Sequence, residues 1–315
     1  MYAGGQTGGK QLVCLPYFFV LGYSKCGTTK LYEILKAHPH FAPPRIKEIH
    51  WFTKHAFEEK FPSNTAYILR YFLSFLSAAN SIEHDPAHKI TGDCSASYAF
   101  QLPFKMNITE TLPNALPLLL TTLLPHSKYI VIVRHPIRRL LSEFYYFAAK
   151  GCKTPANADT FHNTAVNHIN AFNKCLAEKM DDYYCLYRHL DWLEQEEPSC
   201  IQLKLEATLY VYTLQQWIQE IATGNLLVLR NEDLEADDVA VATRLYLFLG
   251  LSLPIEPIFR EFHGVRTNQQ IFLQHPREGN IVIRNDTWNL LSDFFHPYNT
   301  RLADLLQDEA FLWKE

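Results

Sequence analysis

The sequence predicts an α/β fold in three layers, with a central parallel sheet and helices on both of its faces. Three short, continuous apolar runs, at residues 17–22, 129–133 and 226–229, have the character of buried parallel strands. A segment with helical spacing follows each run, and repeated strand-to-helix units of this kind build parallel sheets. Ligands of such sheets bind at the carboxyl ends of the strands, so any site is expected just after these runs.

The first strand-to-helix unit shows most clearly how the spacing of apolar residues changes from a continuous run to that of a helix. Its apolar run ends at a glycine, and from Thr28 onward Leu31, Ile34 and Leu35 recur at the spacing of one helix face. Pro39 then ends the predicted helix. The result is a strand, a tight loop and a helix.

The second and third strand-to-helix units follow the same order. After residues 129–133, Pro136 suits the first turn of a helix that covers residues 138–147. Residues 226–229 are followed by Asn231-Glu-Asp233 and then by a predicted helical stretch through residue 249, with Gly250 as its C-cap.

The segments between these units are predicted to be helical insertions. Residues 57–79 and 161–196 are rich in aromatic and charged side chains, which could line or cover a cleft. The tail, residues 288–313, has the pattern of one or two amphipathic helices broken near Pro297.

Length and composition indicate one large domain. A chain of 315 residues that is 48% hydrophobic can bury a sizeable core, and residues 17–315 show no clear linker. Residues 1–16 are expected to be a flexible leader without a signal-peptide pattern. No apolar run is long enough to span a membrane. The net charge of −4 argues against non-specific binding to nucleic acid, so an anionic ligand must be held by a local site.

The cysteines indicate disulfides more readily than a metal site. None forms a CxxC pair or a Cys/His cluster at zinc spacing, so no metal is predicted. One or two disulfides among Cys152, Cys175, Cys185 and Cys200 would suit an oxidising compartment, although buried thiols are an equally good interpretation. Glycosylation sequons at residues 107–109 and 285–287 favour a secretory lumen.

The loop after the first strand has the composition of a phosphate-binding loop. Backbone N–H groups of a glycine-containing loop that opens a helix bind phosphate oxygens, and a lysine in the loop adds a full charge. No GK[ST] string is present, which weakens an NTP-hydrolysing interpretation, and an ordinary strand-to-helix turn is the alternative. The candidate residues are Ser24, Lys25, Cys26, Gly27, Thr28 and Thr29.

A second candidate anion site follows the second strand. Arg134 stands at the strand end, and Arg139 and Ser142 are three residues apart on the following helix. Two guanidinium groups and a hydroxyl are therefore expected to converge on one phosphate. A single arginine at this place would more often be a surface charge.

A candidate acid/base pair follows the first helix. Glu48 and His50 are two residues apart, with Lys47 beside them and Trp51 and Phe52 behind. The alternative is a solvated loop whose aromatic side chains pack inward.

In combination, these segments resemble the sulfotransferase superfamily, and most closely its carbohydrate sulfotransferases. The likeness extends over nearly the whole chain from residue 17, and the joint occurrence of the motifs in this order is far more specific than any one of them. They are Lys-Cys-Gly-Thr-Thr at 25–29, Lys-Glu-x-His-Trp at 47–51, Gly-Asp-x-Ser-x-Ser at 92–97, Arg-x-Pro…Arg-x-x-Ser at 134–142, Leu-Tyr-Val-Tyr-x-Leu-x-x-Trp at 209–217, Leu-Arg-x-Glu-Asp-Leu at 229–234 and Asp-Glu-Ala-Phe-x-Trp at 308–313.

The resemblance implies a P-loop-like fold and a cofactor, 3′-phosphoadenosine-5′-phosphosulfate (PAPS). It assigns the 5′-phosphosulfate to the loop at residues 24–29, with Lys25 on the oxygen that bridges phosphorus and sulfur. It assigns the 3′-phosphate to Arg134 and Ser142. The loop at residues 277–280, through Arg277 and Gly279, would close over the cofactor.

The resemblance also implies the catalytic roles. Glu48 would be the general base for the acceptor hydroxyl, and His50 and Lys47 would position it or the sulfuryl oxygens. No metal is needed where a lysine neutralises the developing charge. The expected acceptor is a carbohydrate hydroxyl, with an anionic glycosaminoglycan such as chondroitin sulfate foremost and a small molecule or glycolipid as the alternative. The expected location is the Golgi lumen.

Two other functional classes, a kinase and an inactive glycan-binding module, fit the sequence less well. A kinase would need a GK[ST] loop and a magnesium ligand at a strand end, for which only Glu232 and Asp233 are available. An inactive glycan-binding module would not need Lys25, Glu48 and His50 together. Heparan-type relatives carry an aspartate where this chain has Thr53, so heparan specificity is not expected.

Overall fold

The computed structural model gives a placement for most of the chain and divides it into two compact units, which we treat separately. It describes residues 2–3, 10–53, 64–100, 115–148, 155–178, 181–187, 203–253 and 283–314. The first unit comprises Met1–Met106, Asn114–Val133 and Trp217–Thr267, and the second comprises Asn107–Pro113, Arg134–Gln216 and Asn268–Glu315.

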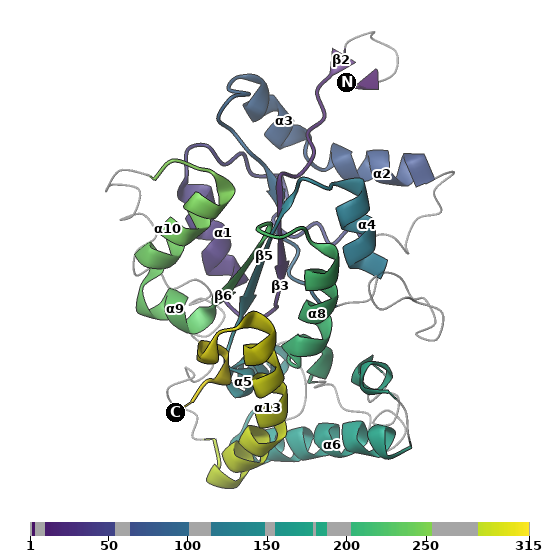
Figure 1. The fold of residues 1–315 in the computed structure, drawn as a ribbon, viewed down its shortest axis with the longest axis vertical. Helices are drawn as coiled ribbons and strands as arrows, with labels where there is room; N and C mark the ends of the chain where they lie inside the picture. The colour runs from purple at the N-terminus through teal and green to yellow at the C-terminus, as the bar shows by residue number, and fades with distance from the viewer. Residues whose placement is uncertain are drawn as a thin grey trace. The chain divides into compact units, whose positions relative to one another are not determined.

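A four-stranded parallel sheet is the centre of the first unit (Figure 1). Its strands are β3 (Phe18–Gly22), β4 (Gly92–Asp93), β5 (Lys128–Val133) and β6 (Leu226–Arg230), in the order β4-β3-β5-β6. The predicted parallel sheet is therefore confirmed. The sequence pattern does not predict β4, because two residues are too few to show a period.

The shape of the sheet depends on close packing at its edge. Gly92 of β4 lies against the ring of Phe18, and a Cβ atom at residue 92 would come within 2.5 Å of that ring. Phe18 and Phe19 are fully buried, and the ring of Phe19 stacks on that of Tyr129 at 5.5 Å. A glycine therefore allows β4 to pair with β3.

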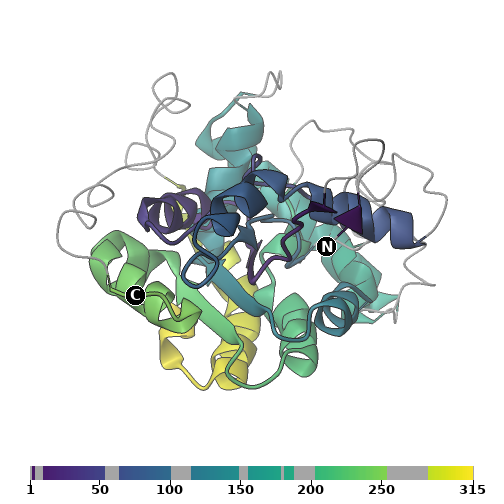
Figure 2. The ribbon, with the colours of Figure 1, turned by 90° about the horizontal axis from the view of Figure 1, so that it is seen from above.

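Helices cover both faces of this sheet, as predicted (Figures 1 and 2). On one face lie α1 (Thr28–Ala37) and α10 (Asp238–Leu249), joined by a 2.7 Å hydrogen bond from the Tyr246 hydroxyl to the Ile34 carbonyl. On the other lies α4 (Ala115–Leu123). The remaining elements of this unit are β1 (Tyr2–Ala3), β2 (Lys10–Gln11), α2 (Asn64–Leu73), α3 (Leu76–Glu83) and α9 (Asn231–Ala236).

The helical stretch predicted to run through residue 249 is interrupted at Asp237. The stretch forms α9 and α10, which are separated at Asp237. The Asp237 carboxylate accepts a hydrogen bond from the Ala240 N–H at 2.9 Å, so it caps the second helix and makes a new start more favourable than continuation. Gly250 ends α10 in the left-handed conformation, as predicted.

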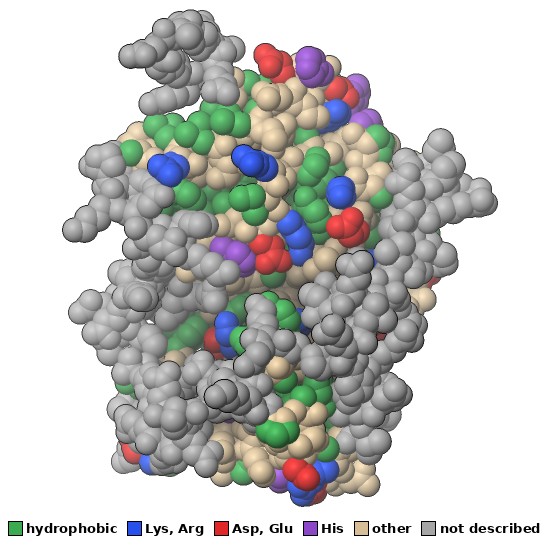
Figure 3. Space-filling model, turned by 180° about the vertical axis from the view of Figure 1, so that it is seen from behind, with side chains coloured by type: hydrophobic (Ala, Val, Ile, Leu, Met, Phe, Trp, Pro, Cys, Tyr) green, Lys and Arg blue, Asp and Glu red, His purple; other side chains and the backbone are tan. Residues whose placement is uncertain are grey.

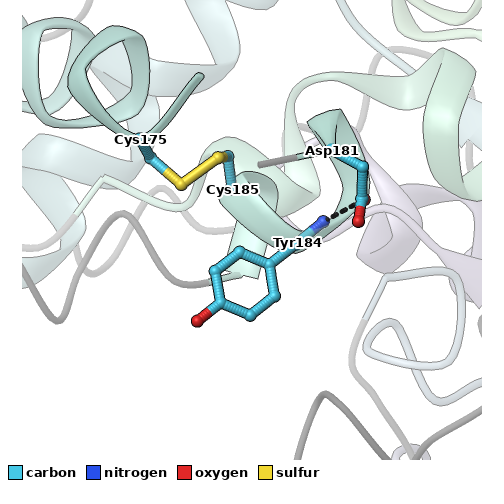
Figure 4. Close-up of a disulfide and its surroundings, with 4 residues drawn as sticks. All are labelled: Cys175, Asp181, Tyr184 and Cys185. Atoms are coloured by element: carbon cyan, nitrogen blue, oxygen red, sulfur yellow. Dashed lines mark hydrogen bonds between the residues drawn. A yellow bond between two sulfur atoms is a disulfide. The ribbon is translucent and has the colours of Figure 1, made fainter. Parts of the chain in front are cut away.

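The second unit is mostly helical. Its described elements are α5 (Pro136–Ala148), α6 (Ala158–Ala177), η2 (Leu205–Ala207), most of α8 (Tyr210–Glu220), α13 (Asn285–Leu306) and η4 (Glu309–Leu312). A disulfide joins Cys175, near the end of α6, to Cys185 (Figure 4). This confirms that a disulfide forms in the cysteine-rich stretch; Cys152 and Cys200 lie outside the described residues.

The predicted break near Pro297 is wrong, because α13 runs through it. Proline removes the hydrogen bond to the carbonyl of Asp293, but both residues are exposed, so water can satisfy that carbonyl. Leu291, Phe295 and Leu302 are buried on either side of Pro297 and hold the helix in place.

Candidate active site

The loop between β3 and α1 carries the predicted phosphate-binding residues. Gly27 is the N-cap of α1 and has φ +96, and Lys25 also adopts a left-handed conformation with φ 69. A Cβ atom at residue 27 would come within 2.6 Å of the Asn231 side-chain nitrogen. Glycine is thus required at residue 27 both by its backbone angle and by the close approach of α9.

The N-terminus of α1 suits an anion. No side chain caps it, and its first turn contains no acidic residue, so neither a capping oxygen nor a carboxylate competes for its N–H groups. Lys30, in the first turn of the helix, is paired with Asp238 at 3.1 Å. Cys26 is buried, and its thiol lies 3.7 Å from the Ser24 carbonyl oxygen. These features fit a loop that holds phosphate or sulfate oxygens.

Lys47, Glu48 and His50 are brought together beside this loop, in the same unit. The Lys47 ammonium donates to Glu48 Oε1 at 2.8 Å and to the Thr29 hydroxyl at 3.1 Å. His50 Nε2 lies 3.0 Å from Glu48 Oε2. Lys47 therefore links the candidate phosphate loop directly to the candidate base. The alternative of a solvated loop explains Trp51 and Phe52, which are both buried, but not this cluster.

Lys47 and His50 keep the Glu48 carboxyl ionised. Partial burial acts to raise the pKa of Glu48, but the hydrogen bonds from His50 and Lys47 and the lysine charge outweigh it and lower the pKa to about 2. An ionised carboxylate can only accept hydrogen bonds, so His50 Nε2 is the donor of this pair.

The segment at residues 92–97 contacts both the backbone and the ring of His50. Ser95 Oγ accepts a hydrogen bond from the His50 backbone N–H at 2.8 Å, and Ser97 Oγ lies 2.7 Å from His50 Nδ1. The Asp93 carboxylate accepts from the Ser95 hydroxyl. The sequence indicates the 92–97 motif but assigns it no role; its signal is the pair of serines two residues apart.

Asp93 is a fully buried carboxyl group among hydroxyls. Tyr71 and Tyr98 donate to its Oδ2 at 3.0 and 2.9 Å, in addition to the hydrogen bond from Ser95. Burial raises the pKa of Asp93 to about 6, although all three hydroxyls favour the ionised form. This carboxyl group holds several side chains in place at once.

The predicted 3′-phosphate residues belong to the second unit. Arg134 follows β5 directly in the chain, and Ser142 lies on α5; both are buried. The Tyr210 hydroxyl donates to the Arg134 carbonyl oxygen at 2.8 Å and accepts from the Arg134 N–H at 3.3 Å. Tyr210 thus fixes the backbone at the point where the chain leaves the sheet.

Arg139 does not join the predicted phosphate cluster. Its guanidinium group is fully buried and bidentate to the Glu143 carboxylate, at 2.8 and 3.0 Å. It also donates to the Thr208 hydroxyl and the Lys204 carbonyl oxygen. The four-residue spacing that places Glu143 on the same helix face explains this, and the interpretation of Arg139 as a phosphate ligand is corrected.

Some predicted features fall outside the described residues, namely Arg277, Gly279 and the sequon at residues 107–109. Across the described ranges, no group of three or more His, Cys, Asp or Glu side chains is gathered as a metal site. In the same ranges no helix is long and apolar enough to cross a membrane.

Fold and site together define the class of the protein. A parallel sheet bears a glycine-containing loop at the end of one strand, and Lys47 connects that loop to an ionised carboxylate and an imidazole. This arrangement places a helix N-terminus that suits an anion next to a group that can accept a proton. The sulfotransferase domain family matches residues 15–269, and the chain belongs to this family.

Curated relatives carry related names. The chain is 29% identical over 330 residues to carbohydrate sulfotransferase 15 of Homo sapiens, an alignment that covers 96% of this chain and 55% of that protein. It is 23% identical to the membrane-associated sulfotransferase kil1 of Dictyostelium discoideum, over 96% of this chain and 68% of the relative. The chain therefore spans about half the length of the carbohydrate sulfotransferase that it matches.

The fold has a counterpart among solved structures. A sulfotransferase from Alicyclobacillus acidocaldarius superimposes with a TM-score of 0.60 at 19% identity, covering 95% of this chain and 99% of that one. At this level of identity the likeness supports the fold alone.

Proposed function

We propose that this chain transfers a sulfuryl group from PAPS to a carbohydrate hydroxyl. The observation that carries the proposal is the position of Lys47, whose ammonium group joins Thr29 of the loop to the carboxylate of Glu48. A donor group held by the loop would therefore lie next to a base. Ser24, Lys25, Cys26, Gly27, Thr28 and Thr29 are proposed to hold the 5′-phosphosulfate.

The remaining cofactor contacts are proposed at the end of the neighbouring strand. β3 and β5 pair in parallel, so their carboxyl ends lie at the same edge of the sheet. Arg134 follows β5 by one residue, and we assign the 3′-phosphate to it and to Ser142. Arg277 and Gly279 are proposed to complete the cofactor site.

Each catalytic residue then has a defined task. When bound, PAPS supplies the sulfuryl group and a phosphate leaving group. Lys25 stabilises the charge that develops on the bridging oxygen, an electrostatic effect that can replace a metal ion. Glu48 accepts the proton of the attacking hydroxyl, and His50 orients the Glu48 carboxylate.

For the acceptor, we propose a glycosaminoglycan such as chondroitin sulfate. Support comes from the names of the curated relatives and from the resemblance of the motifs to N-acetylgalactosamine 4-sulfate 6-O-sulfotransferase. One observation favours a small-molecule or glycolipid hydroxyl as the second candidate. The described Lys and Arg side chains on the face in Figure 3 are scattered among hydrophobic and acidic ones, on a chain of net charge −4.

We also propose that residues 17–315 act as one sulfotransferase domain in the Golgi lumen. The disulfide between Cys175 and Cys185 supports an oxidising compartment.

The proposal is tested by ligand-induced stabilisation and by sulfate transfer. The PAPS product, 3′-phosphoadenosine-5′-phosphate (PAP), should raise the melting temperature more than ATP does at equal concentration, whereas a kinase would prefer ATP with magnesium. Transfer of radiolabelled sulfate is then measured on chondroitin, dermatan, heparan and small-molecule acceptors.

The variant Glu48→Gln separates catalysis from binding. It should keep its affinity for PAP and lose most of its transfer activity, because the amide cannot accept the proton. If the wild-type chain transfers no sulfate to any acceptor but binds PAP and glycan, the glycan-binding alternative is correct. Unchanged turnover in Glu48→Gln would remove Glu48 from the role of base.

A further inference from the structure

Two serines hold His50 at two separate points. Ser95 Oγ accepts from the His50 backbone N–H, and Ser97 Oγ pairs with ring atom Nδ1, at 2.8 and 2.7 Å. Both serines are buried, whereas the His50 side chain remains 13% exposed. His50 also has φ 51, a left-handed conformation that is uncommon for a residue with a side chain. The backbone and the ring of His50 are thus both fixed from the same segment.

Asp93 fixes the orientation of the first serine. The Ser95 hydroxyl has one proton, which it donates to Asp93, so a lone pair is left for the His50 N–H. Tyr71 and Tyr98 hold Asp93 in turn. This set of buried groups therefore supports the backbone of His50.

Glu48 and Ser97 contact the two ring nitrogens of His50 from opposite sides. The Glu48 carboxylate requires a proton on Nε2, so in the neutral imidazole Nδ1 must accept a hydrogen bond. Ser97 can donate this hydrogen bond to Nδ1. The Thr53 hydroxyl lies 2.7 Å from Ser97 Oγ and can donate to it, so the Ser97 proton is not needed for that contact. A directed chain of hydrogen bonds then runs from Thr53 through Ser97 and His50 to Glu48.

From this geometry we infer that Ser95 and Ser97 are positioning residues for the acid/base pair, and that Ser97 holds the His50 ring by donating a hydrogen bond to Nδ1. The inference rests on the proposed function of Glu48 and His50. It gives a role to Ser95 and Ser97 of the 92–97 motif, which act through His50.

The test compares Ser97→Ala with Ser127→Ala. Ser127 is an equally buried serine of the same unit whose hydroxyl donates to the Pro16 carbonyl at 2.9 Å, so its loss controls for the removal of one buried hydrogen bond. Ser97→Ala should lower kcat about 10- to 100-fold through misplacement of His50, with the PAP dissociation constant within about twofold of wild type. Ser127→Ala should leave kcat unchanged, and Ser97→Thr should restore much of the activity.

A double-mutant cycle separates positioning from a purely structural role. In a His50→Ala background, Ser97→Ala should cause no further loss of kcat, because its effect passes through the imidazole. Equal losses with and without His50, or a kcat of Ser97→Ala within twofold of wild type, would overturn the inference.

A spectroscopic measurement tests the same inference without enzyme activity. With ¹⁵N-histidine labelling, the His50 ring, assigned by comparison with His50→Ala, should show the Nε2–H tautomer in the wild type and a shifted Nδ1 signal in Ser97→Ala, where that nitrogen loses its hydrogen-bond donor. An unchanged ring spectrum in Ser97→Ala would contradict the inference, whether or not the wild-type chain transfers sulfate. Absence of sulfate transfer by the wild-type chain would count against the proposed function alone.

Discussion

Lys25 is the residue whose replacement should best separate catalysis from cofactor binding. Its proposed interaction strengthens as charge develops on the leaving phosphate, so Lys25→Ala should reduce kcat by about 100-fold or more while PAP binding weakens far less. Lys30→Ala is the matched control, since Lys30 lies in the first turn of α1 and forms an ion pair with Asp238. Calorimetric titration with PAP and a sulfate-transfer assay measure the two effects. Equal losses in binding and turnover would show that Lys25 contributes only to ground-state binding.

At the scale of elements, the start of α1 should tolerate no side chain at its glycine. Gly27→Ala would place a Cβ atom 2.6 Å from Asn231 in an unfavourable backbone conformation, and it should lower both stability and PAP affinity. Gly250→Ala is a matched control, because Gly250 has a similar positive φ of 71 but no atom near its missing Cβ. We expect a loss of about 1 kcal/mol at Gly250 and about 2–3 kcal/mol at Gly27 in urea unfolding. Similar losses at both positions would mean that Asn231 can move aside.

The elements themselves were largely predictable, for identifiable reasons. The strands β3, β5 and β6 are continuous apolar runs, and each precedes a helix with a clear period. The two incorrect helix boundaries depend on local detail, namely the Asp237 cap and the exposed position of Pro297. Such details are set by hydrogen bonds and solvent contact, which periodicity does not report.

The candidate site was predictable only where its residues are neighbours in the chain. Lys47, Glu48 and His50 lie within four positions, and the sequence indicates them as a group. Their link to Thr29, and the support of His50 by Ser97, join segments 18 and 47 residues apart. Arg139 was misassigned from the sequence alone. Its guanidinium group could bind a phosphate, but it forms a buried ion pair with Glu143 on the same helix.

At the scale of the whole molecule, two buried carboxyl groups should make stability depend on pH. Burial raises the pKa of Asp93 to about 6 and that of Glu206 to about 7, and the Glu206 Oε2 atom has no hydrogen-bond partner among the residues that the structure describes. A carboxyl group with a raised pKa in the folded state stabilises the fold fully below its unfolded pKa. That contribution is lost as the pH rises through the folded value. Stability should therefore fall from about pH 4 to about pH 7.

Replacing Glu206 tests this expectation. Glu206→Gln should raise the melting temperature by a few degrees at pH 8, where the wild type must bury a charge, and should have little effect at pH 5. Glu235→Gln, which removes an exposed carboxylate, controls for the change in net charge. The same shift at both pH values would rule out ionisation of Glu206 as the cause.

The bond between Cys175 and Cys185 has a practical consequence for preparing this protein. The two cysteines are ten positions apart, and their bond ties the end of α6 to the short segment that contains Tyr184 (Figure 4). A host whose cytosol keeps thiols reduced would make the chain without this tie. Recombinant material should therefore be produced by secretion or in an oxidising strain, and its free thiols counted before any failure to bind ligand is attributed to the sequence.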